Sequence, residues 1–299
     1  MDGGGFQSVT QTGLARQPTG APDRLCPPER GIADLSGVAK AGTAVVWDQF
    51  GVLHDGHRAF SGARARCARL AEAGVPMAVV SNSGKRSAAN AERLDRLGFP
   101  SDWFVAVLTS GELAHLRLAK DLREGRLVPG SRIMVLSRGG DLSVVRGLDL
   151  EPVPPGEAAE LVLIAGIDAE RSLAFYHDAL AGAVATGVPC LCCNPDTVTF
   201  RPDGHTTFGP GRLARDYVAA GGAVESIGKP GPAIFEAAIE RLGVPASRCL
   251  MVGDSVAHDG VGATASGMRF CLVTSGVFAG EPAARPDLPV PDHWMTAVA

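Results

Sequence analysis

The sequence predicts an α/β fold: a Rossmann-like, doubly wound parallel sheet with a second α/β domain inserted into it. One observation is the alternation of short apolar runs with amphipathic helical stretches from about residue 40 onward. Another is that the runs are apolar almost without interruption, as is typical of parallel strands that helices cover on both faces. The third is that polar residues gather where several runs end, which is where such sheets bind ligands.

The expected elements follow in chain order. Residues 1–30 are rich in Gly, Gln, Thr and Pro and lack periodicity, so we expect a disordered leader. The expected strands share a high content of apolar residues: Thr43–Asp48, Pro76–Ser81, Trp103–Leu108, Arg132–Leu136, Glu160–Gly166, Val188–Cys193, Cys249–Val252 and Phe270–Val273. The expected helices between them are amphipathic: Ser87–Leu97, Gly111–Arg123, Arg171–Thr186 and Pro232–Leu242.

The interval between Ser81 and Lys229 contains about four of these strands, too many for one crossover connection. We therefore expect an inserted α/β domain at residues 126–200, flanked by the two parts of the core at 31–125 and 201–299. At 299 residues, the chain is long enough to bury the cores of two such units.

Composition restricts the class of protein. Hydrophobic residues make up 45% and charged residues 20% of the chain, which are ordinary values for a globular protein. The formal net charge of −4 comes without a basic cluster, which argues against nucleic acid as a partner. The apolar runs are far shorter than a membrane span, and the N-terminus lacks the features of a secretory signal.

Seven cysteines are spread through the chain. An odd number, with several inside apolar runs, indicates buried reduced thiols of a cytoplasmic protein. Three of them cluster at Cys190, Cys192 and Cys193, but no second Cys or His pair has the spacing of a zinc site, which disfavours zinc.

The apolar run that starts at Thr43 ends on a carboxylate, Asp48. An aspartate at a strand end can attack phosphorus and form an aspartyl-phosphate, and Gly51 permits a tight turn close to a ligand. For an isolated aspartate, a turn or a helix cap is the plainer interpretation. Two residues after Asp48, where a second carboxylate would complete a pair of nucleophile and acid, the chain has Phe50.

Two more carboxylates, Asp254 and Asp259, follow the apolar run Cys249–Val252. Mg²⁺ prefers one or two carboxylates with backbone oxygens and water. Asp254 beside Asp48 would complete such a set, and Asp259 would orient a metal-bound water or Lys229. The alternative is that Asp259 caps the helix that follows, and the spacing alone does not decide between the two.

Two polar turns could meet a phosphate group. Lys229, in a turn before an expected helix, would neutralise phosphoryl charge, although an isolated lysine is more often solvent-exposed. Ser81, Asn82 and Ser83 lie where a strand passes into a helix, and hydroxyl, amide and backbone N–H groups there suit phosphate oxygens.

Taken together, these motifs resemble the four motifs of the haloacid dehalogenase (HAD) superfamily of hydrolases. The matching residues are Asp48, Ser81-Asn82, Lys229-Pro230, Gly253-Asp254 and Asp259. More narrowly, the chain resembles class IIA, the sugar and small-molecule phosphatases with a large α/β cap, which Leu108-Thr109-Ser110-Gly111 and Cys193-Asn194-Pro195-Asp196 also match. The resemblance covers about residues 40 to 285.

The resemblance implies a fold, a cofactor and a set of roles. It implies a cap that gates the site, Mg²⁺ as cofactor and a small phosphorylated substrate, and caps of this kind can pair two copies of a chain. Asp48 would be nucleophile and metal ligand, Asp254 a metal ligand, and Asp259 a support of the metal shell. Phe50 would offer its backbone carbonyl to the metal. The residues implied to meet the substrate are Ser81, Asn82, Ser83, Lys229, Asn194 and Asp196.

Phe50 departs from the class, whose members have an aspartate there that protonates the leaving oxygen. Loss of a general acid typically costs about 10²–10⁴ in rate. Either His54 or Asp55 replaces that acid, or the substrate has a good leaving group, or hydrolysis has been lost and a phospho-ligand binding or regulatory protein remains. An aromatic residue here also occurs in the metal-free dehalogenase branch, so a C–X or C–P bond hydrolase is a further alternative, which the pair Asp254 and Asp259 disfavours.

Overall fold

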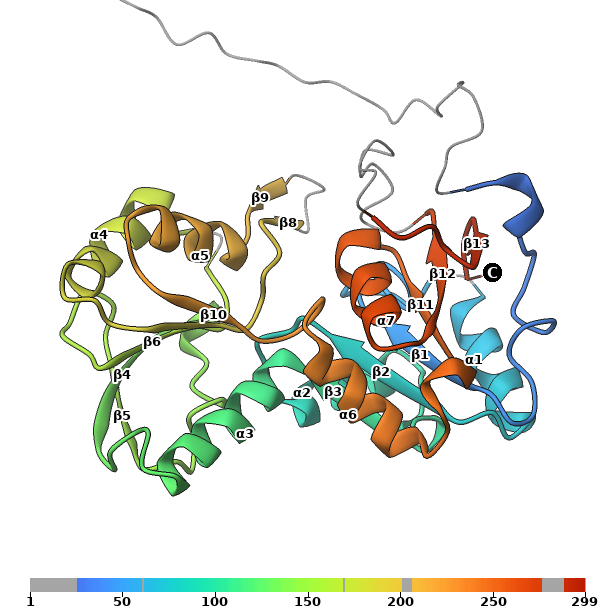
Figure 1. The fold of residues 1–299 in the computed structure, drawn as a ribbon, viewed down its shortest axis with the longest axis horizontal. Coiled ribbons are helices and arrows are strands. Elements are labelled where there is room, and N and C mark those ends of the chain that lie inside the picture. Colours follow the sequence, from blue (N-terminus) through green and yellow to red (C-terminus); the bar gives the residue numbers. More distant parts are fainter. Residues whose placement is uncertain (1–25, 61, 169, 201–205, 276–287, 299) are drawn as a thin grey trace, which may run out of the picture.

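The computed structural model describes residues 26–60, 62–168, 170–200, 206–275 and 288–298. These residues form two lobes, each built on its own parallel sheet (Figure 1). The core lobe holds the first and the last of the described elements, and the inserted lobe holds those between them. The α/β fold class with an inserted second domain, predicted from the sequence, is confirmed.

The core lobe contains a six-stranded sheet in the order β13-β12-β11-β1-β2-β3, and all of its pairings are parallel. Its strands are β1 (Ala44–Asp48), β2 (Met77–Ser81), β3 (Ala106–Thr109), β11 (Cys249–Gly253), β12 (Arg269–Val273) and β13 (His293–Met295). Its helices are α1 (Ala63–Glu72), α2 (Ser87–Arg96), α6 (Pro232–Leu242) and α7 (Val261–Ala265).

The central strand β1 shows why its sequence is apolar throughout. Trp47 packs into a core on one face of the sheet together with Leu70 of α1, and Val46 packs into a core on the other face together with Phe235 of α6. Because successive side chains of a strand point to opposite faces, a strand covered on both sides is apolar at every position. Only at its carboxyl end, at Asp48, does the strand become polar.

The inserted lobe contains a five-stranded parallel sheet in the order β10-β7-β6-β4-β5. Its strands are β4 (Ser131–Leu136), β5 (Leu150–Val153), β6 (Leu161–Ile164), β7 (Cys190–Cys192) and β10 (Val224–Ser226), and a hairpin of β8 (Val198–Phe200) and β9 (Thr206–Phe208) is attached to it. Helices α4 (Leu173–Ala185) and α5 (Pro210–Ala219) cover one face, and α3 (Ser110–Arg123) covers the other.

The inserted lobe continues beyond the predicted boundary at residue 200. Strand β10 pairs with β7, and Leu213 and Tyr217 of α5 pack into the core of the same sheet. Residues 206–226, predicted as part of the core, therefore belong to the inserted lobe. Strand β10 was not predicted because it has only three residues, all half-exposed or exposed, and its sequence therefore contains no apolar run.

Several smaller expectations also need correction. The strand predicted at Trp103–Leu108 begins only at Ala106, because Ser101–Trp103 forms a 3₁₀ turn after Pro100. The end of the predicted leader is ordered: the Trp294 indole N–H donates to the carbonyl of Pro27 at 2.8 Å, and Arg30 donates to the carbonyl of Pro291 at 2.6 Å. Residues 1–25 of the leader lie outside the described residues.

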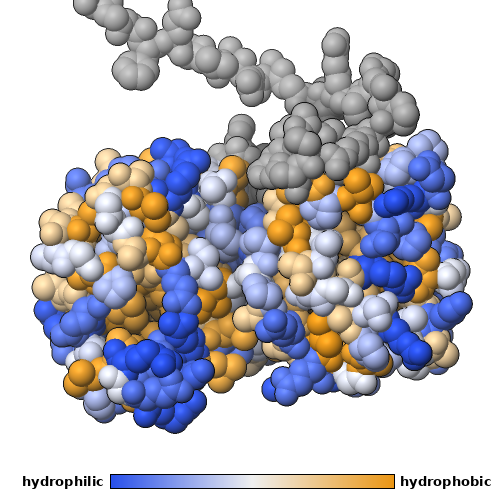
Figure 2. All heavy atoms as spheres, in the orientation of Figure 1, coloured by the Kyte–Doolittle hydropathy of each residue, from blue (hydrophilic) through white to orange (hydrophobic). Residues whose placement is uncertain are grey.

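On the face drawn in Figure 2, hydrophilic and hydrophobic residues are interspersed over both lobes. Among the described residues, the fold contains no helix with the length and apolar character that a membrane crossing requires.

Candidate active site

The carboxyl ends of the central core strands bring three carboxylates together. Asp48 is the last residue of β1, Asp254 follows β11, and these two strands pair in parallel so that their ends are level. Oxygen atoms of Asp48, Asp254 and Asp259 all lie within 4.8 Å of one another, and all three residues are buried. The acidic set that the sequence predicts at this edge of the sheet is therefore formed.

Asp259 reaches this set from a short turn after β11. Residues Val256–Gly260 form one turn of π-helix, and the backbone N–H of Ser255 donates to the Asp259 carboxylate at 3.1 Å. A Cβ atom at Gly253 would lie 2.3 Å from that carboxylate, so the close approach requires glycine. Asp259 thus points back into the site, and the alternative in which it caps helix α7 is wrong, because the cap position there is Gly260.

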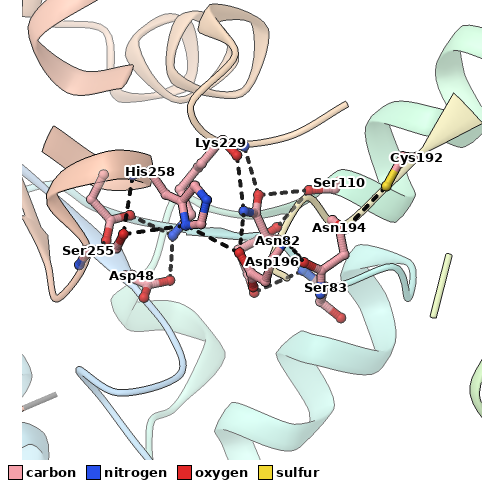
Figure 3. Close-up of polar contacts among 12 residues, drawn as sticks. Asp48, Asn82, Ser83, Ser110, Cys192, Asn194, Asp196, Lys229, Ser255 and His258 are labelled. Atoms are coloured by element: carbon pink, nitrogen blue, oxygen red, sulfur yellow. Dashed lines mark hydrogen bonds and ion pairs between the residues drawn. The ribbon is translucent and has the colours of Figure 1, made fainter. Parts of the chain in front are cut away.

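Lys229 is the positive centre of the acidic set (Figure 3). Its ammonium group donates to Asp48 at 2.6 Å and to Asp259 at 2.6 Å, and the residue is only 3% exposed. Burial by itself would lower the pKa of Lys229, but the carboxylates of Asp259 and Asp48 outweigh it and raise that pKa, so the lysine stays charged. Burial raises the pKa of Asp48 to about 7 against the opposing effect of Lys229.

The predicted phosphate-binding turn holds Lys229 in place. The Asn82 side-chain oxygen accepts from the Lys229 backbone N–H at 2.7 Å, and the Asn82 amide group donates to the Lys229 carbonyl at 3.1 Å. Ser110, at the start of α3, donates to the same Asn82 oxygen at 3.3 Å. Asn82 is therefore engaged with the backbone of the lysine loop. Ser81 and Ser83 line the cavity, and the Ser81 hydroxyl accepts from the backbone N–H of Ser83 at 3.3 Å.

Asn194 and Asp196 connect the inserted lobe to this site (Figure 3). They follow β7, and the Asn194 side chain accepts from the backbone N–H of Asp196 at 2.9 Å. The Asp196 carboxylate lies 3.2 Å from Nδ1 of His258 and 3.4 Å from the Asn82 amide. Burial raises the pKa of Asp196. His258 was not among the predicted site residues, although its position directly before Asp259 placed it in the same motif.

Neither residue proposed as a substitute acid fits that role. His54 is fully buried, its Nδ1 accepts from the Gly56 N–H at 2.8 Å, and its Nε2 lies 3.0 Å from the Gln49 amide nitrogen. Burial lowers the pKa of His54 to about 4, so the ring is neutral near pH 7. Asp55 accepts from the backbone N–H groups of His57 at 2.8 Å and Arg58 at 2.7 Å, which lower its pKa and mark it as a turn residue.

Apart from the buried Asp254, the predicted residues line one cavity of about 570 Å³ between the lobes. From the core lobe its walls include Asp48, Phe50, Ser81, Lys229 and Asp259, and from the inserted lobe Arg138, Asn194, Asp196, Val198 and Thr199. The Phe50 ring is 36% exposed and packs edge-on against His54, with ring centroids 6.1 Å apart. The place expected for a general acid thus presents an apolar ring to the cavity.

Comparisons with known proteins show the family of the chain. A sequence model described as haloacid dehalogenase-like hydrolase matches residues 45–151, and one described as HAD-hydrolase-like matches residues 226–298. Chronophin from Bos taurus is 32% identical over 290 residues, which cover 92% of this chain and 96% of that protein.

Solved structures with a similar fold belong to the same family or to phosphatases. A haloacid dehalogenase-like hydrolase from Brucella suis has a TM-score of 0.77 and 28% identity, covering 89% of this chain and 99% of that one. The glycerol phosphate phosphatase of Mycobacterium tuberculosis, solved in complex with magnesium, has a TM-score of 0.61 and 25% identity, covering 83% of this chain and 75% of that one.

The chain belongs to the haloacid dehalogenase-like hydrolases. The family resemblance that its motifs predict is therefore confirmed. The predicted class of enzyme, a phosphatase, is confirmed as well, since the matched relatives include phosphatases.

Proposed function

We propose that this protein is a magnesium-dependent hydrolase of a small phosphorylated metabolite that reacts through an aspartyl-phosphate on Asp48. The observation that carries the proposal is the position of Asp48, at the end of β1, with one carboxylate oxygen held by Lys229 and the other acidic residues within reach of a shared metal. A protein that only binds a ligand has no need of a nucleophile presented in this way.

The donor set fits magnesium. Asp48, Asp254 and Asp259 offer only carboxylate oxygens, which are the ligands that Mg²⁺ prefers, and the backbone carbonyl of Phe50 would add another oxygen. The relative from Mycobacterium tuberculosis supports this choice because it was solved with magnesium, although it was also solved with calcium. When bound, the ion would neutralise charge on the phosphoryl group.

Each of these side chains has its own role in the two steps of hydrolysis. An oxygen of Asp48 attacks phosphorus while the bond from phosphorus to the leaving oxygen breaks, and the leaving group departs with that electron pair. Lys229 offsets the charge of the phosphoryl oxygens, Asp259 holds Lys229 in position, and the hydroxyls of Ser81 and Ser83 bind the phosphoryl group. Water then attacks phosphorus, which releases phosphate and restores the Asp48 carboxylate.

The choice of leaving group follows from Phe50. An alkoxide leaves slowly without a proton, and among the residues that face Phe50 neither His54 nor Asp55 is suited to supply one. We therefore infer a substrate whose leaving group is a weak base, such as a carboxylate, enolate or phenolate.

The buried cysteines, all in the thiol form, fit the cytoplasmic location that the sequence predicts.

The test is phosphate release from a panel of alkyl, aryl and acyl phosphates with Mg²⁺, for wild type beside Asp48→Asn. We expect turnover that falls at least about 10³-fold in Asp48→Asn and is lost in EDTA, with acyl and aryl phosphates hydrolysed fastest. Equal rates in the two proteins would contradict the nucleophile. Silence of both proteins together with tight binding of a phosphorylated ligand would favour the second candidate, a weakly catalytic binding or regulatory protein, which Phe50 itself favours.

A further inference from the structure

Two arginines in the wall of the cavity have no role in the reaction described above. Arg93 belongs to α2 of the core lobe and is half-buried, and Arg138 follows β4 of the inserted lobe. Among the described residues, neither guanidinium group has an acidic side chain within ion-pair distance. By contrast, Arg86 is paired with Glu112 and Arg126 with Asp121.

The surroundings of Arg93 are positively charged. Burial lowers its pKa, and the nearby charges that add to this effect are those of Arg138 and Arg96, both positive. The charge of Arg93 also lowers the pKa of His54, whose ring is neutral near pH 7. A half-buried cation beside like charges is destabilising unless an anion joins it. Two cations therefore face one cavity, and among the described residues no carboxylate lies within ion-pair distance of either one.

The cavity wall therefore contains two groups of charged residues, an acidic set with Lys229 and a pair of arginines. Asp48, Asp259 and Lys229 line the cavity, with Asp254 buried next to the two carboxylates, and a phosphoryl group and a metal ion would be bound there. Within the part of the chain that the structure describes, the ion pairs of these carboxylates are with Lys229 and none is with Arg93 or Arg138. The phosphoryl group already has Lys229, so the arginines are available for a different part of the substrate.

We propose that the leaving group of the substrate carries a second anionic group, a carboxylate or a phosphate, which Arg93 and Arg138 bind from the two lobes. The inference rests on the proposed function, since it concerns the leaving group of that reaction. A guanidinium group offers parallel N–H donors that match the oxygens of a carboxylate or phosphate. Because one arginine comes from each lobe, the same anion would hold the lobes together around the bound substrate.

The experiment compares two esters that differ by one charge. These are 4-carboxyphenyl phosphate and 4-carbamoylphenyl phosphate, whose size and leaving group are closely matched, together with their meta isomers to vary the spacing. A third arm, 1,4-phenylene bisphosphate, carries phosphate as the second anion. The proteins are wild type, Arg93→Gln, Arg138→Gln and the conservative Arg93→Lys, with Arg96→Gln as the matched control on the exposed side of α2.

We expect wild type to prefer the carboxylate or the bisphosphate over the carbamoyl ester in kcat/KM by about tenfold to a hundredfold, mainly through KM. Arg93→Gln and Arg138→Gln should remove most of this ratio, Arg93→Lys should keep part of it, and Arg96→Gln should keep all of it. Whichever anionic arm shows the larger ratio identifies the second group. A wild-type ratio near one, or an equal loss on charged and uncharged esters in the arginine variants, would overturn the inference.

Failure of this inference and failure of the proposed function give different results. If wild type hydrolyses the carbamoyl ester and the charged esters equally well, the proposed hydrolase function is supported and the second anionic group on the leaving group is contradicted. If no ester is hydrolysed, calorimetric binding of 4-carboxyphenyl phosphate decides: affinity that exceeds that for the carbamoyl ester and falls in Arg93→Gln supports the arginine site, and equal affinity overturns it.

Discussion

The two lobes have the same architecture, a parallel sheet covered by helices, but they bring different chemistry to the cavity between them. The strand ends of the core lobe supply buried groups that hold one another, above all Asp48 with Lys229. The strand ends of the inserted lobe supply half-buried or exposed groups, Arg138 after β4 and Asp196 after β7. Groups fixed by neighbours suit the reaction, and groups open to the cavity suit recognition of the rest of the substrate.

Among the variants that test the different roles of the two lobes, Lys229→Met in the core lobe is expected to lower kcat the most. This change leaves Asp48 and Asp259 close together without their shared cation, and it removes the charge that faces the phosphoryl group. We expect kcat to fall by about 10²–10³. Lys229→Arg is the control that keeps the charge, and circular dichroism of both variants checks the fold. A kcat within threefold of wild type in folded Lys229→Met would contradict the role assigned to the core lobe.

Phe50→Asp should change the reaction in the opposite direction. A carboxyl group at this position could protonate a leaving oxygen, so we expect hydrolysis of alkyl phosphates to rise by about tenfold to a hundredfold, with little change for acyl phosphates. Phe50→Asn, of the same size but without an acid, is the matched control. If the two variants raise alkyl phosphate turnover equally, space and not proton transfer limits the wild-type enzyme.

A smaller effect is expected from the contact between the lobes inside the cavity. In Asp196→Asn the carboxylate that lies 3.2 Å from Nδ1 of His258 is lost, so the lobes are held less firmly around the substrate. We expect KM to rise by about tenfold, with a smaller change in kcat. Steady-state kinetics measure both constants. A change confined to kcat would mean that Asp196 acts on the reacting atoms and not on the approach of the lobes.

The smallest effect is expected where the lobes meet outside the catalytic groups. Lys85 and Asp141 form an ion pair of 3.8 Å between the core and inserted lobes, and the lysine side chain is 42% exposed. Exposed pairs contribute little, so Lys85→Gln should change the free energy of unfolding by less than about 1 kcal/mol, measured in urea. A larger loss of unfolding free energy would show that this surface ion pair, and not the contacts inside the cavity, holds the lobes together.

Much of the catalytic arrangement could be predicted from local sequence, because parallel strands that are buried on both faces are apolar until they end. Asp48, Ser81 and Asp254 stood out as polar residues at such ends, and strand pairing brings these ends to one edge of the sheet. The substitute acids failed for a reason that no local pattern contains. Only the folded chain buries His54 and occupies both of its ring nitrogens.

The sequence by itself determined the α/β fold, the family and the acidic set with its lysine, since each depends on residue types at strand ends and on spacing along the chain. The tertiary structure decided where the inserted lobe ends, because β10 is recognised by its pairing with β7 and not by its composition. It also decided that Arg93 and Arg138 face one cavity, although 45 positions separate them in the printed sequence. Charges that distant elements bring together have no local signature, because their interaction depends on distance in space.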